Sequence, residues 1–125
     1  MPHLTSSSAR SFHVHGVDFR SYVTTAAGAA QLGAWRAEFP PRTIGHAHRM
    51  TCEEVLYLLK GHLEVEVDAE QFTAQAGDAV LVPAQALFRV SNSTDEPAAA
   101  WVTTSLGMTA IMDSDGQRLA PPWAQ

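Results

Sequence analysis

The sequence predicts an all-β fold of the barrel or sandwich type. Short apolar or alternating runs recur along most of the chain, and turn residues separate them at short intervals. A helical interpretation remains only for residues 24–32, where alanines dominate but two glycines interrupt. With 125 residues, of which 46% are hydrophobic, the chain suits one compact domain with a single pocket.

The strand candidates are residues 12–22, 34–39, 54–59, 63–67, 79–82, 87–90 and 98–104. The turns between them lie at residues 40–41, 60–61, 68–70, 77–78, 92–97 and 113–116, which are rich in Pro, Gly, Asp and Asn. We expect residues 1–10, which contain three consecutive serines, to form a flexible N-terminal arm, residues 11–120 to form the barrel domain, and residues 121–125 to form a C-terminal tail outside the core.

Composition argues against several classes of function. The net charge is -5, from 13 acidic and 8 basic residues, and the few arginines are scattered, so we expect no nucleic-acid binding. No apolar run is long enough to cross a bilayer. One cysteine cannot form an internal disulfide, and the first residues lack the pattern of a secretory signal, so we expect a cytoplasmic protein.

One hairpin is predicted in detail, with residues 54–59 and 62–67 joined at Lys60-Gly61. In the second strand Leu63 and Val65 share one face, so His62 on the opposite face is expected to point to solvent.

The most informative motif is His46-Ala47-His48, followed by Glu53-Glu54 and Gly61. On a strand, residues two apart share a face, so both imidazoles would point the same way. Two histidines and a carboxylate suit divalent iron and related metals. Adjacent glutamates on a regular strand point to opposite faces, so only one of the two can join the histidines.

These residues resemble the motifs of a single-domain cupin, a conserved β-barrel of the double-stranded β-helix, jelly-roll-like type. The first cupin motif has two histidines around one residue, a glutamate, six residues and a glycine, and this spacing to Gly61 favours Glu54 over Glu53. The second motif resembles Gly77, Pro83 and Asn92. The resemblance implies a metal held by His46, His48 and Glu54, and a homodimer.

The second motif departs from the cupin pattern at two positions. Gln85 stands where a glycine is usual, and Phe88 stands where the family places its last metal-binding histidine. A phenyl ring cannot coordinate a metal, but burying it would contribute about 1.5 to 3 kcal/mol. Two interpretations stay open: a three-ligand metal site with open positions, and a pocket for an organic ligand without metal.

Other residues are weaker candidates. Possible pocket-lining residues are Trp35, Arg36, Tyr57, Gln71, Trp101 and Thr103, although core packing explains the aromatic ones equally well. His13 and His15 are also two apart, but no carboxylate and glycine follow at the right spacing, so no metal role is expected for them. Cys52 is expected to be a small buried apolar residue rather than a reactive thiol.

The leading functional hypothesis is an oxygenase-like oxidoreductase that acts on a small organic molecule with a divalent metal. The ligands do not identify the metal, which is Fe, Mn, Ni, Co, Cu or Zn. One alternative is a non-catalytic barrel that binds or senses a small molecule, and another is a metal-dependent isomerase, cyclase or lyase.

Overall fold

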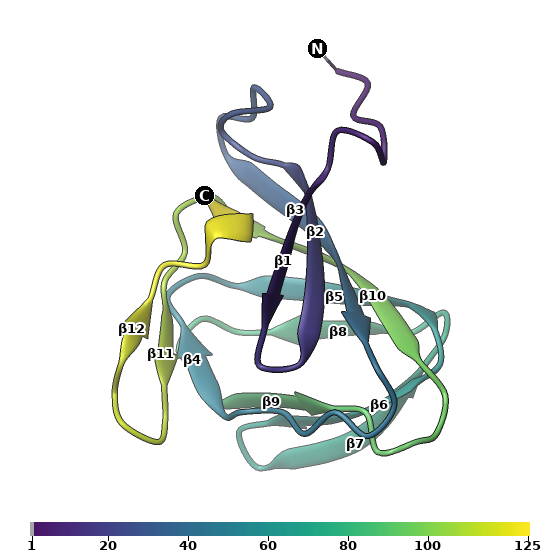
Figure 1. Cartoon of the computed structure of the whole chain (residues 1–125). Helices are drawn as coiled ribbons and strands as arrows, with labels where there is room; N and C mark the ends of the chain where they lie inside the picture. The colour runs from purple at the N-terminus through teal and green to yellow at the C-terminus, as the bar shows by residue number, and fades with distance from the viewer. Residues whose placement is uncertain (1) are drawn as a thin grey trace.

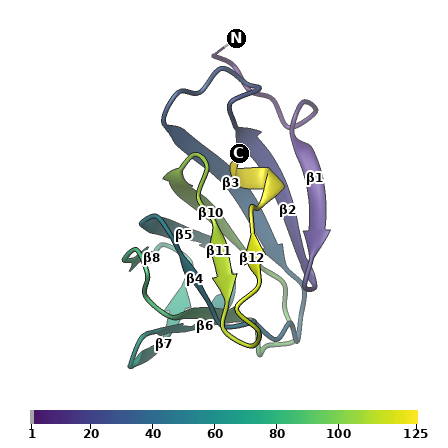
Figure 2. The ribbon, with the colours of Figure 1, turned by 90° about the vertical axis from the view of Figure 1, so that its left-hand side faces the viewer.

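The computed structural model describes residues 2–125 as two antiparallel sheets of six strands that enclose one core (Figures 1 and 2). The first sheet contains, in spatial order, β1 (Arg10–Val14), β2 (Val17–Val23), β3 (Leu32–Phe39), β10 (Ala98–Ser105), β5 (Glu54–Lys60) and β8 (Ala79–Val82). The second contains β12 (Arg118–Leu119), β11 (Ala110–Met112), β4 (His48–Met50), β9 (Phe88–Ser91), β6 (His62–Val67) and β7 (Glu70–Gln75). The predicted all-β fold is confirmed.

Strand alternation determines which side chains reach the core. In β5, Leu56 and Leu58 are buried while Val55 and Tyr57 are exposed. His62 at the start of β6 is exposed, as its strand parity predicts. Both sheets contribute to the core, whose larger members include Trp35, Phe39, Met50, Leu56, Leu58, Leu63, Val65, Val82, Phe88, Val102 and Met108.

The predicted hairpin of residues 54–67 is wrong. β5 pairs with β10 and β8 in the first sheet, whereas β6 pairs with β7 and β9 in the second. The chain crosses between the sheets at Gly61, whose φ is +78°. A Cβ on Gly61 would lie 2.7 Å from the carbonyl oxygen of Pro97 and 2.8 Å from Cα of Ala98. The motif glycine is therefore required both for its backbone conformation and for close packing.

Three other segments differ from the sequence-based expectation. The run 12–22 is divided into β1 and β2 by a turn at His15-Gly16, where both residues have positive φ. Residues 24–31 form bends and turns rather than a helix, with Gly28 at a φ of +101°. Strands β4, β7, β11 and β12 were not predicted, because they are short or lack a clear apolar alternation.

The C-terminal residues 121–125 do not lie outside the core, and that prediction is wrong. They form a short 3-10 helix, η1 (Pro122–Ala124), in which Trp123 and Ala124 are buried. The Trp123 ring stacks on Phe19, with ring centroids 3.8 Å apart and an interplanar angle of 4°. The Ser21 hydroxyl donates a hydrogen bond to the Trp123 carbonyl. The segment thus packs against β2 and β3 (Figure 2).

Buried Asn92 joins three parts of the chain. Its amide group donates to the carbonyls of Phe39, Pro40 and Glu96, while its oxygen accepts from the backbone and hydroxyl of Thr94. Every polar atom of this side chain is therefore satisfied. No helix within residues 2–125 is long and apolar enough to span a membrane.

The Gly61 crossing gives the first prediction. Gly61→Ala should lower the free energy of unfolding by about 2 to 5 kcal/mol, because left-handed strain and forced contacts add. Gly77→Ala is a matched control, since Gly77 also has a positive φ of +95° but no neighbouring atom within 4 Å of a built Cβ. It should lose only about 1 to 2 kcal/mol. Urea denaturation measures both, and equal losses would contradict the steric role of Gly61.

Candidate functional site

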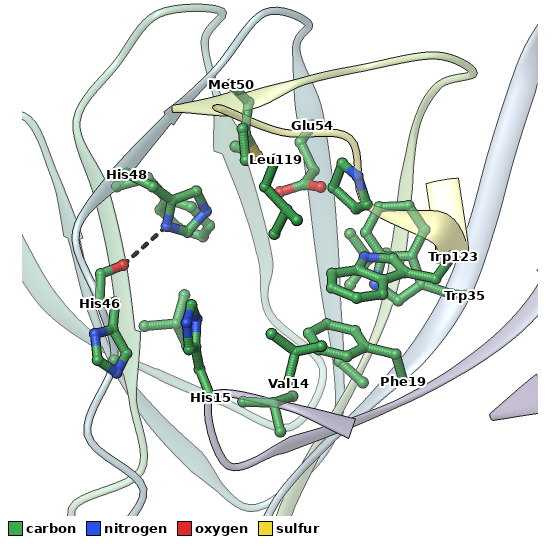
Figure 3. Close-up of a pocket in the computed structure, with 18 of the residues that line it drawn as sticks. Val14, His15, Phe19, Trp35, His46, His48, Met50, Glu54, Leu119 and Trp123 are labelled. Carbon is green, nitrogen blue, oxygen red and sulfur yellow. Dashed lines mark hydrogen bonds between the residues drawn. The ribbon is translucent and has the colours of Figure 1, made fainter. Parts of the chain in front are cut away.

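A cavity of about 140 Å3 lies inside the barrel (Figure 3). Most of its wall is aliphatic or aromatic, as expected for a site that binds a small molecule. The ionisable side chains among the described lining residues are three histidines and one glutamate. The lining residues are Val14, His15, Val17, Phe19, Trp35, Ala37, Phe39, Gly45, His46, His48, Met50, Glu54, Leu56, Phe88, Val90, Val102, Met108, Ala110, Met112, Leu119, Pro121 and Trp123.

Glu54 brings a carboxyl group into this apolar space. It is the first residue of β5, where pairing with Thr104 and Val82 directs its side chain inward, and it is 4% exposed. Within the described chain no hydrogen bond or ion pair reaches its carboxyl group. Burial without a compensating cation raises the pKa of Glu54 to about 8. The group is therefore mainly protonated at neutral pH. Adjacent Glu53 is exposed.

His48 enters the same cavity from β4. Its Nδ1 lies 2.8 Å from the carbonyl oxygen of His46, so Nδ1 donates and Nε2 is left to accept a proton. Burial lowers the pKa of His48, and the nearby His15 and His46 also lower it, against the opposing effect of the backbone hydrogen bond. His48 is therefore a neutral imidazole at neutral pH.

His46 lies at the margin of the cavity. It precedes β4, so the prediction that His46 and His48 share a strand face is wrong. The preceding Gly45 packs so closely on β9 that a Cβ there would lie 1.9 Å from the carbonyl oxygen of Val90. The exposed His46 ring lies against His15, with centroids 4.4 Å apart (Figure 3).

The predicted donor set does not fit a metal in this arrangement. His48 and Glu54 face one cavity, but the His46 ring lies beside His15 rather than beside Glu54 (Figure 3). Among residues 2–125 there is no group of three His, Cys, Asp or Glu side chains that could hold a metal ion.

Phe88 forms an apolar wall next to His48. It is the first residue of β9, pairs with His48 across the sheet and is 3% exposed. The two rings meet edge to face, with centroids 5.5 Å apart. In the same motif Gln85 adopts a φ of +69°, the left-handed conformation for which glycine is the favoured residue.

The structure corrects three of the predicted lining residues. Trp35 lies in the cavity wall, but Tyr57 and Gln71 are exposed on outer faces. Trp101 packs against Tyr22, with centroids 5.4 Å apart, and does not line the cavity. Tyr57 points outward because it alternates with Leu56 and Leu58 on β5. Among the weaker candidates, Arg36 and Thr103 are also absent from the described lining.

Two important lining residues were not identified from the sequence. His15 reaches the cavity from the β1–β2 turn, and Trp123 reaches it from η1. The dipeptide His15-Gly16 is a recognisable turn signal, but it does not show what the turn approaches.

The two-sheet barrel with an internal pocket places this protein in a known class. The cupin domain profile matches residues 35–104, more than half of the chain, so the chain belongs to the cupin family. No curated protein sequence matches the chain.

Solved structures share the fold at low sequence identity. A sugar phosphate isomerase of the cupin superfamily from Silicibacter pomeroyi is 19% identical with a TM-score of 0.76, covering 94% of this chain and 85% of that one. The polyketide cyclase RemF from Streptomyces resistomycificus is 15% identical with a TM-score of 0.75, covering 84% and 79%. An RmlC-like cupin from Shewanella frigidimarina is 19% identical with a TM-score of 0.71, covering 84% and 91%. At these identities the likeness establishes the fold alone.

The raised pKa of Glu54 gives a prediction about stability. The carboxyl of Glu54 releases its proton near pH 4.5 in the unfolded chain but only near pH 8 in the folded protein. Proton binding at Glu54 therefore contributes fully to the free energy of unfolding below pH 4.5, and this contribution is lost as the pH rises towards 8. The loss should reach a few kcal/mol, since each pKa unit is worth about 1.4 kcal/mol.

Urea denaturation of Glu54→Gln between pH 4.5 and 9 measures this contribution. The free energy of unfolding of the wild type should fall relative to that of Glu54→Gln as the pH rises. His48 titrates in both proteins, so its effect on stability cancels in this difference. Glu53→Gln, at the exposed neighbouring position, should follow the wild type. Parallel pH profiles for the wild type and Glu54→Gln would show that the carboxyl has an ordinary pKa.

Proposed function

We propose that this cupin binds a small organic molecule in its cavity and catalyses a non-redox acid–base reaction, such as an isomerisation, a cyclisation or an elimination. The observation that carries the proposal is the buried carboxyl of Glu54, which faces the cavity without a hydrogen-bond partner from the described chain. A buried polar group of this kind gains most from a ligand that supplies the missing partner.

The two titratable groups of the inner cavity have complementary proton states. Glu54 keeps its proton at neutral pH, and His48 remains unprotonated. Environments that move two pKa values in this way create a general acid and a general base in one site. The apolar wall strengthens both effects, because it penalises the charged form of each group.

The simplest reaction for this pair is the enolisation of a carbonyl compound. His48 Nε2 accepts a proton from the carbon next to the carbonyl, and the electron pair of that C–H bond forms the C=C bond. The electron pair of the C=O π bond moves onto the carbonyl oxygen, which takes the proton of Glu54 and becomes the enol hydroxyl. Reversal at another carbon gives isomerisation, and attack by the enol on a second carbonyl gives cyclisation. The names of the cyclase and isomerase with the same fold agree with this class of reaction, although only by analogy.

A metal-dependent, oxygenase-like oxidoreductase is the competing hypothesis. The order of His46, His48, Glu54 and Gly61 supports it, whereas the placement of His46 against His15 does not. A non-catalytic binding barrel is the third, and the apolar Phe88 next to His48 supports it. The three hypotheses differ in turnover and in metal dependence.

Cyclohexanone in D2O provides a test of the acid–base proposal. The wild type should exchange the protons next to the carbonyl for deuterium, as followed by NMR. Glu54→Gln should slow this exchange by about 10²-fold or more, the usual range for one acid–base group. His48→Ala should have a similar effect, and Glu53→Gln should leave the rate unchanged.

Metal analysis and chelation separate the alternatives in the same samples. The acid–base proposal expects exchange that survives EDTA and does not follow metal content. Exchange that requires a stoichiometric metal, lost in His46→Ala, would instead support the metal site. Saturable binding of cyclohexanone without exchange would support the binding barrel.

We also propose that the protein is a homodimer that pairs through an outer apolar patch of Val55, Tyr57 and Leu81. These side chains are 41%, 47% and 57% exposed, and Val55 pairs with Leu81 across β5 and β8. The patch carries no charge and includes the edge strand β8, so a second copy matches it better than a charged partner does.

Light scattering at micromolar concentration should give the mass of a dimer. Leu81→Glu should give a monomer, because it would bury an unpaired charge at the interface. Leu32→Glu is the matched control, since Leu32 is 58% exposed but lies on β3, outside the patch. A monomeric wild type, or a dimer that tolerates Leu81→Glu, would contradict this interface.

A further inference from the structure

We propose that the cavity selects an uncharged, flat molecule of about one ring that carries a carbonyl or hydroxyl group, and that it rejects phosphorylated and carboxylated molecules. This inference rests on the proposed function for the identity of the site. It adds the size, shape and charge of the ligand.

The volume of the cavity limits the size of the ligand. At about 140 Å3, the space is close to that of an engineered apolar cavity of about 150 Å3 that binds benzene. One six-membered ring with a short substituent fills such a space, whereas two fused rings exceed it.

The walls favour a flat ligand. Phe19 and Trp123 form a nearly parallel stack, and the Trp35 side chain lies beside them on the same side of the cavity (Figure 3). Phe88 adds an aromatic surface next to His48. Flat π surfaces pack best against flat partners, in offset or edge-to-face contacts.

The charges of the lining oppose an anion. None of the described lining residues is Lys or Arg, and the protonated carboxyl of Glu54 supplies no positive charge to offset an anion. The described chain has no α-helix, so no α-helix N-terminus is available to bind phosphate. A buried anion would therefore lose its hydration without compensation.

The polar groups of the lining also orient the ligand. Glu54 lies on one side of the cavity, and His15, His46 and His48 lie on the other (Figure 3). Apolar side chains make up most of the remaining lining. A ligand with its carbonyl or hydroxyl at one end of the ring can therefore bond to Glu54 while the ring contacts the aromatic wall.

The three tryptophans allow a direct binding test by NMR. Trp35 and Trp123 line the cavity, and Trp101 lies outside it. Their indole N–H signals therefore report on the cavity, with Trp101 as an internal control. We would titrate the protein at pH 7.5, about one unit above the ordinary pKa of histidine, with acetophenone, benzoate, 2-acetonaphthone and glucose 6-phosphate.

Acetophenone should shift the signals of Trp35 and Trp123 saturably and leave that of Trp101 unchanged. Benzoate and glucose 6-phosphate should bind at least about 100-fold more weakly, because a buried anion lacks a counter-ion. The two-ring 2-acetonaphthone should also bind poorly. Benzoate or 2-acetonaphthone binding as tightly as acetophenone would overturn the inference, as would shifts confined to Trp101.

Variants at Glu54 test the polar contact. Glu54→Leu should weaken acetophenone binding by about tenfold, the effect of one hydrogen bond, and leave the binding of ethylbenzene unchanged. Glu53→Leu should change neither. Equal weakening of both ligands by Glu54→Leu would show a general loss of packing and contradict the contact.

The outcomes separate this inference from the proposed function. Tight benzoate binding together with Glu54-dependent exchange of cyclohexanone would refute the inference and keep the function. Selective acetophenone binding without any exchange would keep the ligand class and refute the catalytic role.

Discussion

The site depends on one constraint, the period-two alternation of β5. This strand directs Leu56 and Leu58 into the core, and the same alternation directs Glu54 inward at its first position. An ionised carboxylate is costly in such surroundings, and the described chain offers it no cation. The protein therefore holds a protonated acid inside its barrel. A shift of one residue in the register of β5 would expose this group and the two leucines beside it.

Alternation predicted the faces of the strands better than it predicted their partners. His62 and Leu63 point to opposite sides as expected, yet β6 belongs to a different sheet from β5. A period of two determines which side chains share a face, whereas the partner strand depends on contacts between distant residues. The crossing at Gly61 depends on Pro97 and Ala98, far along the sequence. For the same reason the sequence alone does not predict the burial of the proline-rich C-terminus, because that burial depends on contacts with Phe19.

In the candidate site, too, local pattern predicted some residues, and contacts between distant residues determined others. Motif spacing identified Glu54, and strand parity then required Glu53 to point outward. The orientation of His46 could not be derived in this way, because the chain before β4 is held against β9 at Gly45. His15 joins the cavity through the β1–β2 turn, which is distant in sequence from the motif. Motif spacing therefore identified Glu54 and His48, and non-local packing determined the positions of His46 and His15.

The protonation of Glu54 and the occupancy of a metal site are linked, so they are not independent questions. A divalent cation beside the carboxyl would favour its ionised form and lower its pKa, whereas the apolar wall raises it. Phe88 contributes to that wall at the position where the cupin pattern has a histidine. Replacing a ligand by a phenyl ring thus removes a donor and also disfavours the charged carboxylate that a metal requires. Both effects favour Glu54 as a proton donor over Glu54 as a metal ligand.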